Sequence, residues 1–249
     1  MKISKFKVVV LALSISLIPF EPAQAATKYP SKIISLSPSA TEDLFALGAG
    51  KQVIAVDDNS NYPSEAPISK LSSFNPNVEA IAKYKPDLVI IQNTATKSAA
   101  VVKQLQSLKI ATYIEKTPSN LDGLFSELTD LGGLTGKQTK AKMVINTIKV
   151  ARLTAIAGAK KSLPVTFYHE LDNMLFSATS STFIGKVYAD FNLKNIADAA
   201  SKSDDGGYPQ LQNEYVISAN PKLIFLADAQ YGESIAKIKM RPAWSSISA

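Results

Sequence analysis

Glu79-Ala-Ile-Ala-Lys-Tyr-Lys-Pro86-Asp-Leu-Val-Ile-Ile91 decides the fold, because the second half of the chain repeats its pattern as Glu214-Tyr-Val-Ile-Ser-Ala-Asn-Pro221-Lys-Leu-Ile-Phe-Leu226. Each copy has a glutamate, a short apolar segment, a proline seven residues after the glutamate, and then a run of β-forming residues. Proline and the residue before it disfavour helix, so each copy predicts a two-turn helix followed by a buried strand. Two copies of one unit predict two similar lobes with a binding cleft between them.

Strands and helices alternate through the rest of the chain. Strands are predicted at residues 33–36, 53–56, 88–91, 111–114 and 165–168, and helices at residues 40–48, 98–108 and 182–192. Ser39 with Glu42 fits a capping box at the start of the first of these helices. The alternation predicts an α/β fold of two Rossmann-like lobes with mainly parallel sheets.

The longest predicted helix runs from Lys137 to about Ala157, a stretch without Gly or Pro in which apolar residues recur at helical spacing. About 20 residues of helix span about 30 Å, so this segment predicts a stiff connection between the lobes. The predicted organisation is a signal peptide (1–25), an N-terminal lobe (26–135), a connecting backbone helix (136–160) and a C-terminal lobe (161–249).

The first 25 residues have the pattern of a signal peptide. Lys2, Lys5 and Lys7 precede an apolar run over residues 8–18, and Ala23-Gln24-Ala25 forms a small-residue cleavage site. The apolar run is shorter than the ~20 residues of a membrane span; an uncleaved anchor is the alternative. We therefore expect export to the periplasm or the extracellular face of the cytoplasmic membrane, with no stable membrane span after cleavage.

The composition excludes several functions. The chain has no cysteine, which removes disulfides, thiol catalysis, iron–sulfur ligation and a lipid-anchored cysteine. Its net charge of +6 comes from interspersed residues rather than from a basic stripe, so we expect no nucleic-acid partner. Neither a Gly-x-Ser-x-Gly elbow, nor a paired-histidine metal motif, nor a phosphate-binding glycine loop occurs. We expect a monomer that is not an enzyme.

A family resemblance covers nearly all of the chain after residue 25. The stretch Ile33-Ile-Ser-Leu-Ser-Pro-Ser-Ala-Thr-Glu-Asp-Leu-Phe-Ala-Leu-Gly48 resembles the opening of substrate-binding proteins of ABC importers for vitamin B12, ferric siderophores and haem. Further matching stretches follow in the family's order: Asn61-Tyr-Pro63, Val78-Glu-Ala-Ile81, Lys85-Pro-Asp-Leu-Val89, Thr182-Phe-Ile-Gly185, Asn195-Ile-Ala197, Tyr208-Pro-Gln-Leu211 with Glu214, and Arg241-Pro-Ala-Trp244.

The resemblance implies two α/β lobes joined by one long helix. It also implies capture of a metal chelate, a corrinoid such as cobalamin or a ferric siderophore or haem, and its delivery to an ABC permease dimer with a cytoplasmic ATPase. The chelate is cargo, and no resident cofactor is expected. Family members usually continue past the Arg-Pro-x-Trp region with another strand and a helix, whereas this sequence stops at Ala249. Either the sequence is a fragment, or the protein lacks these elements; in the second case the C-terminal lobe would have an open sheet edge and exposed apolar surface.

Glu79 and Glu214 match the family positions that pair with arginines of the two permease subunits, so the resemblance implies a permease-docking role. Two charged contacts held apart by a stiff helix would make docking sensitive to the distance between the lobes. The alternative is that each glutamate only complements the positive end of a helix. Because the same spacing from glutamate to proline occurs in both copies, we favour the docking role over the helix-charge role.

The cleft should be lined by loops at the strand ends that face the other lobe. The candidate ligand-binding residues are Ser37, Thr41, Asp58, Asn59, Tyr62, Phe74, Asn93, His169, Glu170, Ser180, Tyr208 and Tyr231. Aromatic residues with a polar edge suit a large ligand with apolar faces. Alternatively, Phe74 belongs to a core and Tyr62 braces the Pro63 turn.

His169 is the one histidine of the chain. It could be an axial ligand to a cobalt or iron centre, or a structural residue. A bare zinc or manganese ion would require several histidines and carboxylates, so no resident metal site is predicted. Two rival functions remain open: a secreted hydrolase that uses His169, and a non-transport ligand-binding or sensor protein.

Overall fold

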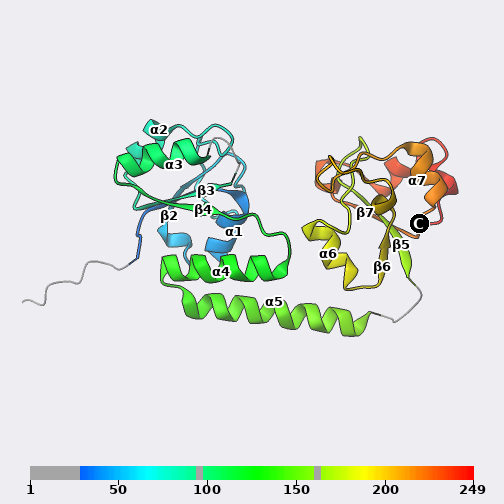
Figure 1. Ribbon diagram of the computed structural model, residues 1–249, viewed down its shortest axis with the longest axis horizontal. Coiled ribbons are helices and arrows are strands. Elements are labelled where there is room, and N and C mark those ends of the chain that lie inside the picture. Colours follow the sequence, from blue (N-terminus) through cyan, green and yellow to red (C-terminus); the bar gives the residue numbers. More distant parts are fainter. Residues whose placement is uncertain (1–28, 94–97, 160–163) are drawn as a thin grey trace, which may run out of the picture.

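The computed structural model describes residues 29–93, 98–159 and 164–249, so the predicted signal peptide lies outside the described residues. Two α/β lobes lie at the two ends of a long helix, α5 (Gln138–Gly158) (Figure 1). The predicted two-lobe fold is confirmed. No helix among the described residues is long and apolar enough to cross a membrane.

The N-terminal lobe is a parallel sheet with helices on both faces. Its strands are β1 (Ile33–Leu36), β2 (Val53–Val56), β3 (Leu88–Gln92) and β4 (Ala111–Glu115), in the order β2-β1-β3-β4. Helices α1 (Pro38–Ala46) and α4 (Leu121–Thr135) pack on one face, and α2 (Val78–Lys83) and α3 (Ser98–Ser107) on the other. Each face carries its own apolar cluster, so β3 is buried on both sides.

The C-terminal lobe is a smaller parallel sheet. Its strands β5 (Val165–Glu170), β6 (Leu193–Asn195) and β7 (Leu223–Leu226) have the order β6-β5-β7. Its helices are α6 (Phe183–Ala189), α7 (Asn213–Ala219) and α8 (Ile235–Lys239). Short 3₁₀ turns lie at Gly50–Gln52 in the first lobe and at Ile196–Ala199, Ala229–Tyr231 and Trp244–Ser246 in the second.

The two copies of the repeated unit form α2–β3 and α7–β7. In both, the residue before the proline has a left-handed backbone: φ is +50° at Lys85 and +43° at Asn220. This conformation ends each helix and turns the chain into the following strand. The sequence repeat is therefore also a repeat of backbone geometry.

Two local predictions are corrected. The first helix is capped by Ser37, whose hydroxyl accepts a hydrogen bond from the Ala40 amide, rather than by Ser39. Pro38 needs no N–H partner, so it occupies the first helical position and moves the cap to the residue before it. The second copy's strand is not buried: Leu223 of β7 is 40% exposed, because β7 is an edge strand of its sheet.

An apolar groove lies beside β7. Its cavity has a volume of about 650 Å³ and is lined by side chains that include Leu223, Ile238, Trp244 and Ile247. Within the described residues β7 is paired with β5 alone, so this groove lies at an edge of the sheet.

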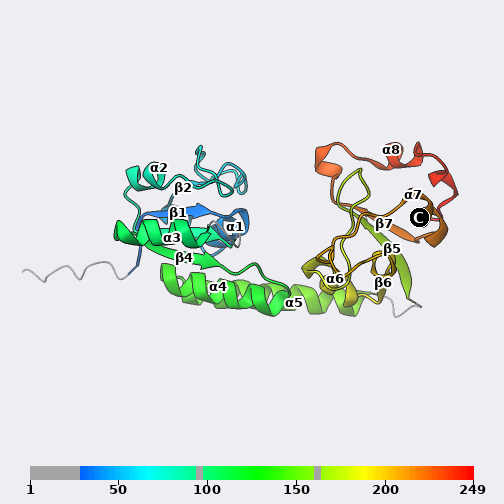
Figure 2. The same cartoon turned by 45° about the horizontal axis from the view of Figure 1, so that its top comes forward.

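The connecting helix α5 matches its prediction to within one residue at each end. Val144, Ile145 and Ile148 pack against the N-lobe core beside α4, and Ala141 is the residue of α5 that is buried. The rest of the helix extends beneath the second lobe, as Figure 2 shows. It is a surface connection rather than an internal element of one sheet domain.

Candidate ligand cleft and docking face

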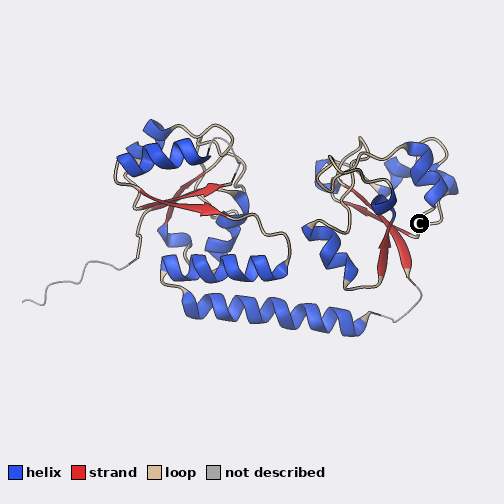
Figure 3. Ribbon diagram, viewed as in Figure 1, coloured by secondary structure: helices blue, strands red, loops and turns tan. Residues whose placement is uncertain are grey.

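The strand ends of the N-terminal lobe point toward the C-terminal lobe. Figure 3 shows the arrowheads of its strands directed at the second lobe, so the loops that follow β1, β2 and β3 lie at the facing end. In the C-terminal lobe, the corresponding loops follow β5 and β7. The predicted cleft residues come from these loops and from neighbouring ones.

Ser37 and Thr41 do not reach the surface in this structure. Both are fully buried, and the Thr41 hydroxyl donates to the Ser37 carbonyl at 2.8 Å and contacts the Ser60 hydroxyl at 3.1 Å. They brace the turn between β1 and α1 rather than line a cleft. Their prediction as ligand contacts is corrected, because polar residues after a strand also serve as helix caps.

Asp58 and Asn59 are exposed on the loop after β2. The buried Asp57 holds this loop: its carboxylate accepts from the Asn59 amide at 2.9 Å and from the Ser60 hydroxyl at 2.6 Å. The two neighbours stay exposed to solvent, with Asn59 Nδ2 donating a hydrogen bond to Asp58 Oδ1 at 3.3 Å. Asn93 is also exposed, at the end of β3.

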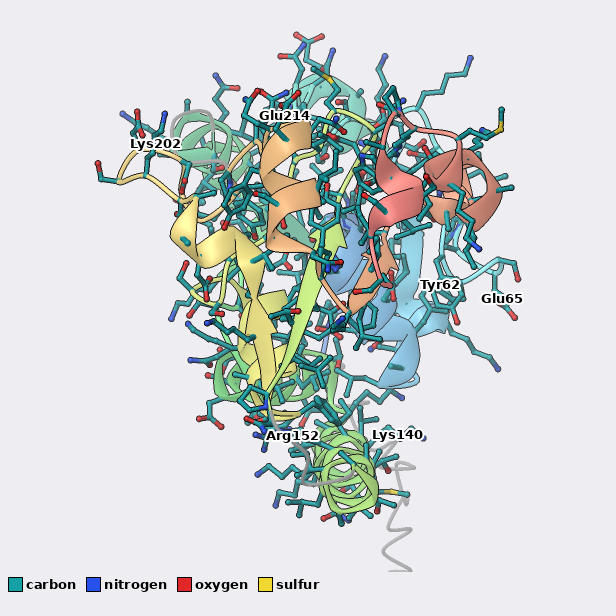
Figure 4. The ribbon with its side chains drawn as sticks, turned by 90° about the vertical axis from the view of Figure 1, so that its right-hand side faces the viewer. Tyr62, Glu65, Lys140, Arg152, Lys202 and Glu214 are labelled. Carbon is teal, nitrogen blue, oxygen red and sulfur yellow. The ribbon has the colours of Figure 1, made fainter. Side chains whose placement is uncertain are left out.

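Phe74, Tyr208 and Tyr231 are exposed aromatic residues, with Phe74 67% accessible. The alternative that Phe74 belongs to a core is therefore excluded in this structure. Tyr62 is exposed as well and borders a groove beside α1 with Phe45. Figure 4 places Tyr62 next to Glu65 on the flank of the molecule.

The amide and the hydroxyl of Ser180 already have hydrogen-bond partners within the C-terminal lobe. Its amide donates to Asp198 Oδ1 at 2.8 Å and its hydroxyl donates to Asp198 Oδ2 at 2.7 Å. This pair fixes the loop before α6. A ligand would have to compete with Asp198 for the Ser180 hydroxyl.

His169 is a structural residue. Its side chain is packed beneath α6, where Nδ1 is hydrogen-bonded to the Tyr188 hydroxyl at 3.0 Å and Nε2 is buried. Burial lowers the pKa of the imidazole, which keeps it neutral. The predicted axial-ligand role is corrected, because His169 and Phe167 face the side of β5 that α6 covers. A hydrolase that uses His169 has no support in this geometry.

Glu170 is also not a ligand contact. It is fully buried and receives two hydrogen bonds from Arg241, at 2.6 and 2.7 Å. Arg241 donates a third bond to Glu233 at 3.0 Å and lies 4.6 Å from the centre of the Trp244 ring. The bidentate pair holds the chain after α8 onto the end of β5.

Asp228 completes this charged group. One oxygen each of Asp228, Glu170 and Glu233 lie within 4.8 Å of one another, and Asp228 Oδ1 is buried without a hydrogen-bond partner. Because Arg241 already occupies the space between Glu170 and Glu233, the group reads as an ion-pair cluster rather than a metal site. The sequence showed Arg241 only as part of a family motif.

A second acidic cluster was missed in the N-terminal lobe. Asp43 of α1, Glu115 at the end of β4 and Glu127 of α4 come together, and Glu115 and Glu127 are almost fully buried. Burial, and then the charge of Glu115, raise the pKa of Asp43 to about 7 and that of Glu127 to about 8. Ser39, at the facing end of the lobe, donates a hydrogen bond to Glu115.

The two lobes are tied together at their base. Lys186 Nζ of α6 donates to the Ser119 carbonyl of the N-terminal lobe at 2.9 Å. Arg152 of α5 makes two 2.6 Å bonds to Asp190 at the end of α6. A cavity of about 190 Å³ lies among these groups. The contacts hold the second lobe against the connecting helix.

Glu79 and Glu214 lie on one face of the molecule. Each is exposed in the first turn of its helix, α2 or α7. Figure 1 shows α2 and α7 on the side opposite α5. In Figure 4, Glu214 lies at the far end of the view from the end-on α5. The repeat therefore places the two helices that carry these exposed glutamates on the same side of the molecule, one in each lobe.

Comparison with known proteins identifies this architecture. The model of a family described as periplasmic binding protein matches residues 33–249. The chain belongs to this family. The predicted class of two-lobed substrate-binding proteins is thereby confirmed.

Two curated relatives are 28% and 29% identical to the chain over the aligned residues. An uncharacterized ABC transporter substrate-binding lipoprotein of Bacillus subtilis is 28% identical over 229 residues, which is 89% of this chain and 70% of the relative. A cobalamin-binding protein of Halobacterium salinarum is 29% identical over 203 residues, 78% of this chain; the chain spans only 53% of that relative.

Solved structures share the fold. A possible iron-binding periplasmic solute-binding protein of Staphylococcus epidermidis superposes with a TM-score of 0.72 at 26% identity, over 89% of this chain and 87% of that one. The match spans both lobes, so the arrangement around the connecting helix is a property of the family.

Proposed function

We propose that this chain is an exported solute-binding protein that captures a metal chelate between its lobes and delivers it to an ABC permease dimer with a cytoplasmic ATPase. The observation that carries the proposal is the pair Glu79 and Glu214, both exposed, on the matched helices α2 and α7, which lie on the side of the molecule opposite α5. Two fixed charges on separate lobes suit a two-subunit partner that carries positive charge.

The cargo is a corrinoid or a ferric siderophore or haem. Relatives named for cobalamin and for iron support this class. The exposed aromatic side chains of Phe74, Tyr208 and Tyr231 offer flat apolar surfaces with polar edges, which suit a large planar chelate. His169 supplies no metal bond in this structure, because it is buried under α6.

Transport would use the contacts at the base of the lobes. The Lys186–Ser119 and Arg152–Asp190 contacts limit how far the lobes separate in solution. The protein would close slightly on the chelate, dock as a monomer through both glutamates, and release its cargo when the permease spreads the lobes.

Calorimetric titration with cobalamin, haem and several ferric siderophores tests this proposal. Calorimetry is preferable to fluorescence because Trp244, the one indole, is buried beside Tyr168 in the second lobe. We expect one chelate to bind with a Kd of about 1 μM or below. Absence of binding to all three classes would overturn the cargo assignment.

Aromatic substitutions locate the site. Phe74→Ala and Tyr208→Ala should each weaken binding by about tenfold or more, since stacking on a ligand contributes about 1 kcal/mol or more. Tyr84→Ala is the matched control, because Tyr84 is a partly exposed aromatic residue at the far end of α2. Equal effects of all three substitutions would contradict a cleft between the lobes.

A further inference from the structure

The connecting helix α5, together with its N-cap residue Lys137, carries five basic residues and no acidic residue. Two of the five are engaged: Arg152 pairs with Asp190, and the Lys149 ammonium lies 4.9 Å from the centre of the Phe125 ring. Lys140 and Lys142 are exposed near the N-terminal end of the helix. A helix of this length without a single acidic residue offers a continuous positive potential.

The outward face of α5 is also apolar. Met143, Val150 and Leu153 are 58%, 52% and 62% exposed. At 3.6 residues per turn, they lie on the side opposite Ile145 and Ile148, which face the N-lobe core. Monomer surfaces rarely align large apolar side chains without a partner for them.

The basic and apolar residues form one surface, which we name the α5 outer face: Lys140, Lys142, Met143, Lys149, Val150 and Leu153. By helical spacing, Lys140 lies on one flank of the apolar row, and Lys142 and Lys149 lie on the other. Figure 4 shows α5 end-on, protruding from the body of the molecule, with Lys140 on one flank and Arg152 on the other. An apolar row between cationic flanks is the pattern of helices that lie on membrane surfaces.

We propose that the α5 outer face binds the surface of an anionic phospholipid bilayer. Lysine ammonium groups pair with phosphate headgroups, while the three apolar side chains enter the headgroup region. A second copy of the chain fits less well, because its own α5 would bring lysines against lysines. The polar residues Asn146 and Thr147 are exposed among the three apolar side chains. A surface that mixes polar and apolar groups in this way suits the headgroup region of a bilayer.

The position of this face has a consequence for the transport cycle. It lies opposite α2 and α7, the helices that carry Glu79 and Glu214. The protein cannot rest on a bilayer through α5 and present both glutamates to a permease in that same bilayer at once. Membrane contact is therefore a state between docking events, and it does not depend on which chelate is carried.

Vesicle co-sedimentation tests the proposal, with the secreted form of the chain and vesicles of phosphatidylglycerol and phosphatidylcholine or of phosphatidylcholine alone. We expect binding to the anionic vesicles and loss of it at high salt. The triple variant Lys140→Glu, Lys142→Glu, Lys149→Glu should bind at least about a hundredfold more weakly, since each lysine contributes a factor of about five. Met143→Ser, Val150→Ser, Leu153→Ser should bind about tenfold more weakly.

The matched control reverses three exposed lysines elsewhere in the N-terminal lobe: Lys70→Glu, Lys83→Glu and Lys103→Glu. It has the same net charge as the α5 variant and should bind as the unmodified chain does. If both variants lost vesicle binding equally, the proposal would be overturned, because binding would then depend on the net charge of the protein alone. Tighter binding to soluble polyglutamate than to vesicles would overturn it in favour of an acidic protein partner. Because Lys149 contacts Phe125, Lys140→Gln with Lys142→Gln provides a milder second variant that should still weaken binding severalfold.

Discussion

The two lobes contain the same helix–strand unit but stabilise it differently. In the N-terminal lobe, β3 is a central strand buried by apolar clusters on both faces. In the C-terminal lobe, the equivalent β7 is a half-exposed edge strand, with one apolar cluster beside α7 and α8 and a group of aromatic rings under α6. The chain after α8 is held by Arg241 and its carboxylates.

This difference shows that a repeated sequence unit does not fix how its strand is buried. The apolar run Leu223 to Leu226 is as apolar as Leu88 to Ile91, yet only the latter has strands on both sides. Burial depends on neighbours that are distant in sequence. The second lobe should therefore depend on charge pairing where the first depends on packing.

The largest expected effect is in the second lobe. Arg241→Ala leaves the fully buried Glu170 without its partner and should lower the free energy of unfolding by about 3–5 kcal/mol. Urea unfolding followed through Trp244, which lies in this lobe, measures the shift in midpoint. Arg152→Ala is the control: it removes an exposed pair and should cost less than about 1 kcal/mol. Similar losses in the two variants would contradict the dependence on a buried pair.

The acidic cluster of the first lobe and His169 of the second lobe should respond to pH in opposite directions. In the first, the folded-state pKa values of Asp43 and Glu127 are raised to about 7 and about 8, above their ordinary values. The stability that the two protonated carboxyls contribute is fully present below about pH 4 and is lost as the pH rises through these two pKa values. The expected loss in the free energy of unfolding is on the order of 3 kcal/mol. Hydrogen exchange of the β3 amides at pH 5 and at pH 8 measures this loss of stability. The Glu127→Gln variant should show a smaller difference in stability between the two pH values.

In the second lobe, the folded-state pKa of His169 is lowered by burial. The stability that neutral His169 contributes is present above its ordinary pKa of 6.5 and is lost as the pH falls. Trp244-monitored unfolding of the unmodified chain and of His169→Gln isolates this component. A His169→Gln variant with unchanged pH dependence would show that the imidazole is not buried in the folded state.

A smaller effect compares the two equivalent strands directly. Ile90→Val in β3 removes one methylene from a fully buried side chain and should cost about 1 kcal/mol. Ile224→Val in β7, at a half-buried position, should cost less than half as much. Denaturant unfolding of both variants gives the ratio, with hydrogen exchange to assign each loss to its lobe. Equal costs would mean that β7 is as well packed as β3.

The smallest effect concerns the base of the lobes. Arg152→Ala releases α6 from α5 and should widen the range of distances between the lobes without changing the fold of either. Spin–spin distance distributions between labels on α2 and α7 measure this range. An unchanged distribution would show that the Arg152–Asp190 pair does not limit the lobe separation.

The sequence predicted the elements because their signals are local. Prolines 86 and 221 mark helix ends, and the uninterrupted stretch from Lys137 marks the connecting helix. The candidate site was harder to predict, because which side of a strand end faces solvent depends on the packing of other elements. Glu170 looked accessible beside His169, but its partner Arg241 lies 71 residues later.

Residues that remain predictions are those at exposed loop positions: Asp58, Asn59, Tyr62, Phe74, Asn93, Tyr208 and Tyr231. Ser180 remains one as well, with its hydroxyl engaged by Asp198. The acidic cluster of the first lobe carried no sequence signal, because its three carboxylates come from three separate elements. Only the fold brings them together.

The double variant Glu79→Arg, Glu214→Arg tests the central claim, with uptake of the bound chelate by cells and its calorimetric affinity measured on the same protein. Under the proposed docking role, charge reversal at these two exposed positions should lower uptake at least about a hundredfold and leave the affinity within about twofold. Glu42→Arg with Glu65→Arg, which reverses two other exposed glutamates, should leave both quantities unchanged. Unaltered uptake, or a loss of affinity that parallels the loss of uptake, would contradict the assignment of these two residues to permease docking.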